Sequence, residues 1–530
     1  MDLLKYINTY TYPNIDDIQN LNDNFEELQN KLSSFYSSNQ KKTGAYYTPM
    51  YVASFIYEFS VRFNYNLDFL FIKNDKTMFL NNPLSNKYLY KDTVLDPSCG
   101  NGEFLYYATK YKLDLLNQGV TQVNYYNNNF NDSIVKILST IYGNDINPIA
   151  IHIAKLKIFL LVTQYTTNEQ ILKKCIATLD KNFTTFDFAK SIPDFYKNKK
   201  FDLILGNPPY IEDRNYNNKP TTRYGNIYAN FLANGIQLLK EEGIIGFILP
   251  ISYVSTPRMR KIRKYVDENL KTQYIYNFSD TPGTLFNNVH QKISILIGKK
   301  TNYGKGIFTT GYKIFGQDEK EELIDNITHS IIINNYKKED FIYKVGSPKE
   351  KDIINKINQY DNSLLNLLND NGEYKMFLNQ RLTFWVKCFT YKVQGNDYKE
   401  YSFKNKDIRN FVYLILNSSL FWWYWTTISD GWHITKKEFL NFTINNDVIN
   451  NIHNYSDKME TLISNLETKL EQTKRYIGSK QVDYEYKHKK CLKEINDIDN
   501  FIYSLYNINV EQQQFIQSFI DYRTYNRKGK

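Results

Sequence analysis

Between about residues 44 and 300, short apolar runs alternate with segments of helical pattern, and this alternation strongly constrains the fold. Four of the runs, at residues 93–95, 141–142, 202–205 and 246–249, end in turn residues or in polar residues. Continuous apolar runs of this kind are typical of strands that are buried on both faces, with helices as crossover connections between them. The pattern therefore predicts an α/β fold with a mostly parallel sheet.

The alternation is lost past about residue 305, and a helical pattern returns from residue 456. We therefore expect four parts. They are an N-terminal helical segment (residues 1–40, with a polar amphipathic helix over 14–38), the α/β domain (41–303), a mixed domain (304–450) and a helical C-terminal segment (451–530).

Apolar residues at steps of three and four predict two helices in the C-terminal segment. These residues are Met459, Leu462, Leu466 and Leu470, followed by Cys491, Ile495, Ile498, Ile502 and Leu505. Two interpretations stay open: a helical hairpin that packs on its own domain, or a coiled-coil contact with a second protein subunit.

The composition sets broad limits on partners and location. A net charge of +10 permits a polyanionic partner but does not identify one. The four cysteines are scattered, without a CxxC pair or a nearby histidine cluster, so we expect neither disulfides nor a bound metal. The N-terminus lacks a secretion signal, and the most apolar stretch (411–425) is interrupted by Asn417, Ser418 and Ser419. We therefore expect a cytoplasmic protein without a membrane segment.

Acidic residues lie next to the expected strands at three places, and the first of them is followed by two glycines. Asp96 ends the first strand and leads into Gly100 and Gly102, where the backbone can turn sharply into a helix and approach a ligand. Asp145 ends the second strand, a position from which a carboxylate can accept hydrogen bonds from ribose hydroxyls. Asp187 lies before the next strand. Each residue alone is typical of a cap or a turn, but in this order they support one another.

The strongest signal is Asn207-Pro208-Pro209-Tyr210, directly after a buried-type strand. Two prolines fix the backbone and remove donors, so the turn offers acceptors: the Asn207 side-chain oxygen and the Pro208 carbonyl. A planar amino group needs two acceptors to direct its hydrogens, and Tyr210 offers a ring on which a base can stack. The alternative is a rigid structural turn.

With these motifs the chain resembles the amino-methylating DNA methyltransferases, in particular the N6-adenine gamma class of TaqI-like motif order and restriction-modification type. Residues 44–49 (Gly-Ala-Tyr-Tyr-Thr-Pro) match the first motif of that class, and residues 96–104 match its Gly-rich motif. The resemblance covers roughly residues 40–300. It implies a Rossmann-like methyltransferase domain followed by a target-recognition domain, S-adenosyl-L-methionine as cofactor, double-stranded DNA as partner and a flipped-out adenine as target. It also implies a prokaryotic cytoplasm.

The resemblance carries roles over to matching residues. It implies Asn207, Pro208, Pro209 and Tyr210 as catalytic residues, with Tyr210 also on the base. The cofactor residues that it implies are Tyr47, Thr48, Pro49, Asp96, Ser98, Gly100, Gly102, Asp145, Ile146, Asp187, Phe188 and Asn207. One departure concerns a late aromatic residue that packs on the flipped base in the family. Phe286 is the candidate here and His290 the second choice, but the spacing to Ser294 is long, and Phe286 as plain core is the alternative.

Basic and aromatic clusters are candidates for contact with DNA. Pro257 predicts a helix start, and the helix carries Arg258, Arg260, Lys261, Arg263 and Lys264, a face for phosphates or simply a solvated face. The aromatic run at 421–425 is typical of a core, although aromatics there and at 430–433 could also stack on nucleic acid. Alternatives for function are methylation of RNA or of a protein amide, or a non-catalytic DNA-recognition subunit. The long stretch after residue 300 favours a large substrate.

Overall fold

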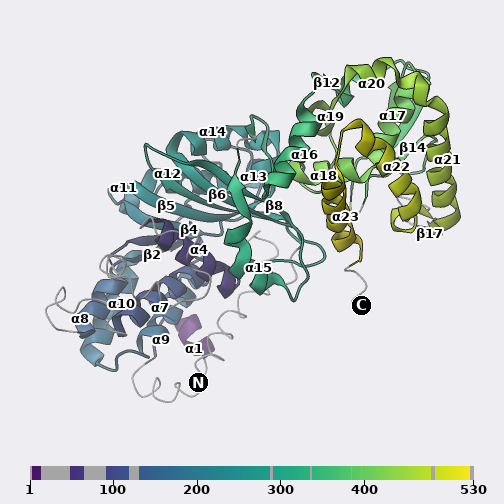
Figure 1. Ribbon diagram of the computed structural model, residues 1–530. Helices are drawn as coiled ribbons and strands as arrows, with labels where there is room; N and C mark the ends of the chain where they lie inside the picture. The colour runs from purple at the N-terminus through teal and green to yellow at the C-terminus, as the bar shows by residue number, and fades with distance from the viewer. Residues whose placement is uncertain are drawn as a thin grey trace.

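The computed structural model describes residues 3–13, 48–64, 91–117, 130–286, 290–334, 337–382, 385–395, 397–478 and 484–525. Figure 1 shows two lobes: a first lobe built around a large sheet and a second lobe in which helices dominate. The amphipathic helix predicted over 14–38 and residues 44–47 of the first motif, including Tyr47, lie outside the described residues.

The sheet of the first lobe has the order β3-β2-β1-β4-β5-β7-β6-β8-β9. Its strands are β1 (Val94–Asp96), β2 (Ile141–Asp145), β3 (Phe183–Thr185), β4 (Phe201–Gly206), β5 (Leu239–Pro250), β6 (Leu270–Phe278), β7 (Ile293–Lys300), β8 (Gly306–Lys313) and β9 (Ile331–Ile333). Strands β1 to β5 are parallel and follow the 3-2-1-4-5 order of Rossmann-like sheets, whereas β7 is antiparallel to β5 and β6. The predicted α/β fold with a mostly parallel sheet is confirmed, and the four apolar runs correspond to β1, β2, β4 and β5.

The sheet extends past residue 303, where we expected the α/β domain to end. Strand β8 pairs in parallel with β6, from Thr272 opposite Gly306 to Phe278 opposite Lys313, and β9 adds an antiparallel edge. The middle of β8 is Thr309-Thr310-Gly311, which does not read as a buried apolar run, although both threonines are buried. A division at residue 303 therefore cuts this sheet between β7 and β8.

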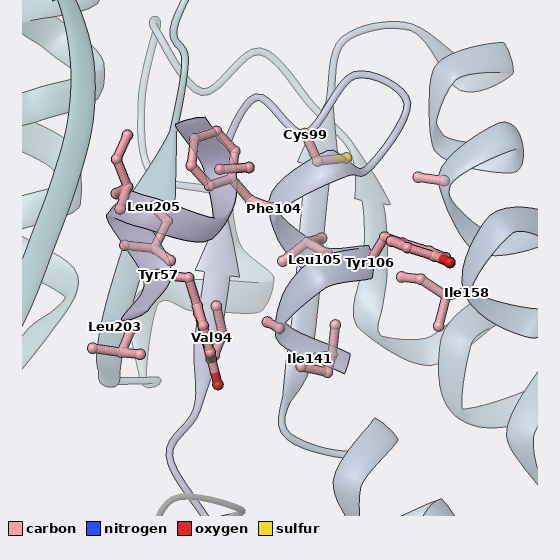
Figure 2. Close-up of a cluster of buried hydrophobic side chains, with 14 of the residues drawn as sticks. Tyr57, Val94, Cys99, Phe104, Leu105, Tyr106, Ile141, Ile158, Leu203 and Leu205 are labelled. Carbon is pink, nitrogen blue, oxygen red and sulfur yellow. The ribbon is translucent and has the colours of Figure 1, made fainter. Parts of the chain in front are cut away.

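Helices cover both faces of the sheet. The helices of this lobe are α1 (Leu3–Thr9), α4 (Met50–Asn64), α7 (Glu103–Asn117), α8 (Phe130–Leu138), α9 (Pro148–Val162), α10 (Glu169–Asn182), α11 (Asp194–Lys197), α12 (Tyr228–Leu238), α13 (Ser252–Ser255), α14 (Arg260–Asn269) and α15 (Lys320–Asn326). In Figure 2, Tyr57 of α4 and Leu105 of α7 share a core with Leu203 and Leu205 of β4. Ile204 between them belongs to the core on the other face, with α12. Strands buried on both faces are apolar without alternation, which is why these runs could be recognised.

The second lobe has its own core, which extends from Phe341 to Ile520. Its helices are α16 (Pro348–Asn358), α17 (Lys406–Asn417), α18 (Ser419–Ile428), α19 (Lys436–Asn441), α20 (Asn446–Asn450), α21 (Ser456–Thr473), α22 (Leu492–Leu505) and α23 (Val510–Tyr525). Its short strands are β10 (Lys337–Lys338), β11 (Phe341–Ile342), β12 (Asn362–Ser363), β13 (Tyr374–Asn379), β14 (Cys388–Phe389), β15 (Tyr398–Phe403), β16 (Thr443–Ile444), β17 (Arg475–Tyr476) and β18 (Tyr484–Glu485).

The aromatic run at 421–425 lies in α18 and is buried throughout. The Trp422 ring stacks on Trp425 with 4.9 Å between ring centroids and on Trp385 with 5.5 Å. The interpretation of this run as core is therefore confirmed. These rings are not available to nucleic acid.

The C-terminal helices pack on their own lobe. Met459, Leu466 and Leu470 of α21 and Ile498 and Ile502 of α22 are fully buried in the same core as α18. This arrangement corresponds to the first of the two interpretations, a hairpin on its own domain, because the predicted apolar stripes are already covered within the chain.

A buried carboxyl group holds the start of α18. The Ser419 N–H donates to Asp499 Oδ1 at 2.7 Å, whereas Asp499 Oδ2 is buried and has no hydrogen-bond partner among the described residues. Burial raises the pKa of Asp499 to about 7. An ordinary aspartate has a pKa of about 4. Between these values the folded protein keeps a proton that the unfolded chain has released, so stability falls as the pH rises.

We expect Asp499→Asn to raise the thermal midpoint at about pH 8, because the amide keeps an acceptor oxygen and never ionises. The advantage over the unsubstituted protein should shrink towards about pH 4, where Asp499 is protonated in both states. Thermal melting at several pH values measures this. Asp497→Asn, at an exposed position on the same helix, is the matched control. A midpoint difference that does not depend on pH would contradict the assignment.

Candidate active site

A cavity of about 460 Å³ lies where the parallel strands end, at the carboxyl edge of the sheet. The ends of β1, β2 and β4, the start of α7 and the segment after β3 supply its walls. The predicted residues that line it are Thr48, Asp96, Ser98, Gly100, Asp145, Ile146, Asp187, Phe188, Asn207 and Pro209. The structure therefore brings together residues that are far apart in the sequence, as expected for an open α/β fold.

The turn from β1 into α7 depends on two glycines with positive φ. Gly100 has a φ of +49° and Gly102 a φ of +84°, a region that other residues rarely adopt. A Cβ atom on Gly102 would lie 2.8 Å from the Cβ of Ala154 in α9, so glycine is also required by close packing. The Ser98 hydroxyl oxygen in this turn is buried and has no hydrogen-bond partner among the described residues. Ser98 itself lines the cavity.

Two carboxylates lie at the ends of β1 and β2. Asp96 Oδ1 accepts the Ser98 N–H at 3.0 Å, while Asp145 accepts the N–H groups of Gly100 and Asn147, both at 2.9 Å. Burial raises the pKa of both carboxyl groups, and the charge of Asp145 adds to the rise for Asp96. Each oxygen of Asp145 accepts one of these bonds, and the Ile146 N–H also bonds to the carboxylate. A carboxylate has about four acceptor positions, so Asp145 can still accept from a donor in the cavity.

Apolar side chains at the rim complement these carboxylates. Ile146 is 57% exposed and Phe186 is 41% exposed, whereas Phe188 is buried against Phe231 with 5.5 Å between ring centroids. The sequence prediction named Phe188, which lines the cavity from the core, and did not assign Phe186. The sequence Phe186-Asp187-Phe188 could have indicated Phe186 as a second candidate, because it places an aromatic residue on each side of Asp187.

A loop after β4 covers part of the cavity and binds Asp187. The Tyr216 hydroxyl donates to one carboxylate oxygen of Asp187 and the Asn218 side-chain amide to the other, both at 2.8 Å. Residues 215–218 also line the cavity. No sequence pattern indicated this loop, because its contacts join residues about 30 positions apart.

Asn207 is fixed from both sides at the end of β4. Its Nδ2 donates to Thr48 Oγ1 at 3.3 Å, and its Oδ1 accepts the Tyr210 hydroxyl at 2.7 Å. The same hydroxyl lies 3.2 Å from the Ile248 carbonyl oxygen in β5. These bonds set the orientation of the amide, and its oxygen can accept a second hydrogen. Pro208 and Tyr210 adjoin the cavity without lining it.

The structure corrects the prediction for Phe286. Its side chain is 1% exposed and belongs to the core on the α4 face of the sheet, and it does not line the cavity. The Tyr51 hydroxyl donates to the Leu285 carbonyl at 2.7 Å and holds this segment against α4. A ring buried in this way offers no face to a base. His290 is exposed, with Nδ1 3.3 Å from the Asp280 carbonyl oxygen.

The basic helix is α14, preceded by a short 3-10 turn at Pro257–Met259. Its cations are largely engaged within the protein. Arg263 is buried and donates to the carbonyls of Tyr253, Thr256 and Glu339. Arg258 pairs with Glu212 at 2.6 Å, and Arg260 pairs with Asp340. Burial therefore excludes Arg263 from a phosphate-binding face. Arg258 and Arg260 are paired but remain 45% and 47% exposed, and Lys261 and Lys264 are exposed beside them.

The described part of the chain contains no helix with the length and apolarity needed to cross a membrane. Within the same part, no three His, Cys, Asp or Glu side chains are grouped so that they could hold a metal ion.

Comparison with known proteins identifies a family match within the first lobe and several relatives of this chain. Residues 139–284 match the model of the Eco57I restriction-modification methylase family. The type II methyltransferase M.BstVI of Geobacillus stearothermophilus is 26% identical over 259 residues, which cover 46% of this chain and 44% of that protein. The type II restriction enzyme and methyltransferase RM.Eco57I of Escherichia coli is 25% identical over 227 residues. These residues cover 34% of this chain and 22% of that protein.

The matches thus span less than half the length of these two relatives. A solved structure, the type IIL restriction-modification enzyme MmeI in complex with DNA, aligns with 92% of this chain and 80% of its own, at 13% identity and a TM-score of 0.48. The family match includes Asp145, Asp187 and the turn at 207–210. The resemblance to restriction-modification DNA methyltransferases that the motifs indicated is therefore confirmed, and the family match that supports it lies at residues 139–284.

Proposed function

We propose that this protein transfers a methyl group from S-adenosyl-L-methionine to N6 of an adenine in double-stranded DNA, as the modification component of a restriction or phage-defence system. The observation that carries the proposal is the Asn207 amide. It lies in the cavity wall, held by Thr48 on one side and by Tyr210 on the other. An oxygen fixed in this way is suited to accept a hydrogen from an amino group.

The cavity fits the cofactor in both size and chemistry. Its volume of about 460 Å³ is within the range usual for ligand sites. Asp145 would accept the ribose hydroxyls, and the exposed side chains of Ile146 and Phe186 would cover the adenine ring. The buried Ser98 hydroxyl, without a partner among the described residues, would bind the amino-acid end. When bound, S-adenosylmethionine supplies an electrophilic methyl group on sulfur.

The turn at 207–210 would prepare the nitrogen that attacks. An exocyclic amino group is a weak nucleophile because its lone pair is delocalised into the ring. Asn207 Oδ1 and the Pro208 carbonyl would each accept one of its hydrogens, which directs the lone pair towards the methyl group. Thr48 keeps the Asn207 NH2 group turned away, so that the oxygen faces the substrate. The ring of Tyr210 would stack on the base.

A base within a duplex cannot reach this turn, so the proposal includes flipping of the adenine out of the helix, at a cost of a few kcal/mol. The second lobe, with a core from Phe341 to Ile520, would supply the contacts that read the DNA sequence. The names of the matched relatives, a type II methyltransferase and a type II restriction enzyme and methyltransferase, support DNA as the substrate.

Transfer of tritium from labelled S-adenosylmethionine to DNA, RNA and protein, assayed in parallel, tests the substrate class. We expect label in DNA only. Single-molecule sequencing of DNA from a host that expresses the protein then identifies the modified base and its sequence context. Label in RNA or in protein amides would replace the proposal with one of the alternatives, and a lack of label in all three would indicate a recognition subunit.

Asn207→Ala should lower methyl transfer by about a hundredfold or more, because the amino group loses an acceptor that directs its lone pair. The cofactor dissociation constant should change by no more than about threefold, since the alanine leaves the Asp145 contacts in place. Tyr210→Phe, which keeps the ring but removes the 2.7 Å bond to Asn207, should cost up to about tenfold in turnover. Retained turnover with lost cofactor binding in Asn207→Ala would contradict the catalytic assignment.

Asp145→Ala should weaken cofactor binding by roughly 1.5–3 kcal/mol, because two charge-assisted hydrogen bonds to the ribose are lost. Asp145→Asn, which keeps one acceptor oxygen, should show an intermediate loss. Isothermal titration of the cofactor measures both, with thermal melting as a check on folding. Asp194→Ala, at an exposed position that begins α11, serves as control. An unchanged dissociation constant in Asp145→Ala would rule out a ribose contact.

A further inference from the structure

Trp432 differs from the other tryptophans of the chain. Its side chain is 40% exposed, whereas Trp385, Trp422, Trp423 and Trp425 are at most 4% exposed. It follows α18 in the segment 430–433, where the second lobe meets the first. If Trp432 served only to join the two lobes, its ring would be buried between them. Burial of a large aromatic surface stabilises the folded state, and an exposed ring does not provide this stabilisation.

The backbone around Trp432 is held firmly. Asp430 Oδ1 accepts the N–H groups of Trp432 and His433 at 2.8 and 2.9 Å, and the Trp432 carbonyl accepts the Leu382 N–H at 2.9 Å. Gly431 has a φ of +76°, and a Cβ atom there would lie 2.6 Å from the side chain of Lys292. The ring is therefore presented from a defined turn rather than from a loose one.

A cation of the first lobe lies on the ring. Lys292 Nζ is 3.3 Å from the centroid of Trp432, close enough for a cation–π contact. The same ammonium forms a 2.8 Å ion pair with Asp280, and both side chains are almost fully buried. Because Asp280 holds the ammonium in a buried ion pair, the cation that covers one face of the indole has a defined position. The second carboxylate oxygen, Asp280 Oδ2, is buried and has no hydrogen-bond partner among the described residues.

Trp432 lies at the same edge of the sheet as the turn at 207–210. The Lys292 carbonyl accepts the Ile251 N–H at 2.9 Å, directly after β5 ends at Pro250. Three residues before Ile251, the Ile248 carbonyl lies 3.2 Å from the Tyr210 hydroxyl. The end of β5 thus links the Lys292–Trp432 contact to the Asn-Pro-Pro-Tyr turn.

We propose that Trp432 is a base-stacking residue for DNA, and that the base displaced at the methylation site stacks on the exposed face of its indole. The proposal rests on the proposed function above. The sequence suggested Phe286 as the aromatic residue that packs on the base, but the Phe286 ring is buried. The proposal assigns this role to Trp432 of the second lobe instead. Stacking of this kind contributes about 1–3 kcal/mol per base.

A coupling experiment tests this contact with the full-length protein. Two duplexes carry the site identified by sequencing, one with adenine at the target position and one with an abasic site there. Trp432→Ala should weaken binding to the adenine duplex by between about fivefold and about a hundredfold. Binding to the abasic duplex should change by less than about twofold, because no base is present to stack. Trp432→Phe should retain most of the affinity for the adenine duplex.

Tyr303→Ala is the matched control, since Tyr303 is exposed and lies after β7, at the opposite edge of the sheet. Binding of both duplexes should be unchanged in this variant, and cofactor affinity should be unchanged in all variants. An equal loss on both duplexes in Trp432→Ala, or no loss on either, overturns this proposal alone if the unsubstituted protein methylates DNA. If the unsubstituted protein transfers no methyl group to DNA, the proposed function fails and this proposal fails with it.

Discussion

The hydrogen bond from the Gly100 N–H to Asp145 Oδ2, 2.9 Å long, joins the two motifs on which the cavity depends. It connects the turn after β1 with the end of β2, strands that are neighbours and parallel in the sheet. Gly100 and Gly102 both have positive φ, so the chain can turn sharply after this bond, and the missing Cβ of Gly102 allows α7 to begin against α9. The turn thus lies directly beside Asp96 and Asp145, which end neighbouring strands and line the same cavity.

Much of the site could be predicted from the sequence because its parts follow directly from strand ends. Asp96, Asp145 and Asn207 each stand within a residue of the last position of β1, β2 or β4. In a parallel sheet these ends share one edge, so recognising the strands was enough to place the side chains together. The chemistry of the Asn-Pro-Pro-Tyr turn could also be predicted from these four residues alone, because prolines lack backbone N–H donors in any tertiary context.

The parts that escaped prediction depend on contacts across the fold. Arg263 was predicted as one of a row of exposed cations, but its guanidinium is buried and donates to the Glu339 carbonyl 76 positions away. Phe286 has the residue type of a stacking ring, and only its packing against the α4 face excludes that role. The burial of these two side chains cannot be predicted from the local sequence pattern, since it depends on elements that are distant in the sequence and pack against them. The same reason applies to Tyr216 and Asn218 on Asp187.

The junction of the lobes explains why net charge is a weak guide to which cations are exposed on the surface. Lys344 is buried, and its Nζ donates to Ser255 Oγ at 3.1 Å and to the Ser429 carbonyl at 2.8 Å. Lys437 Nζ donates to the carbonyls of Ser255 and Ile428, at 2.8 and 2.6 Å. Burial lowers the pKa of Lys344 well below its usual range.

These lysines are therefore used to hold α13, on the first lobe, against the end of α18, on the second. A buried amino group that loses its hydrogen-bond partners is costly, by about 1–3 kcal/mol, so the junction resists opening. Ser429, which Lys344 binds, lies three residues before Trp432. The contacts that join the lobes thus also fix the distance between the second lobe's exposed indole and the end of β5. A side chain from the second lobe can therefore lie at the same edge of the sheet as a cavity that is lined by residues of the first lobe.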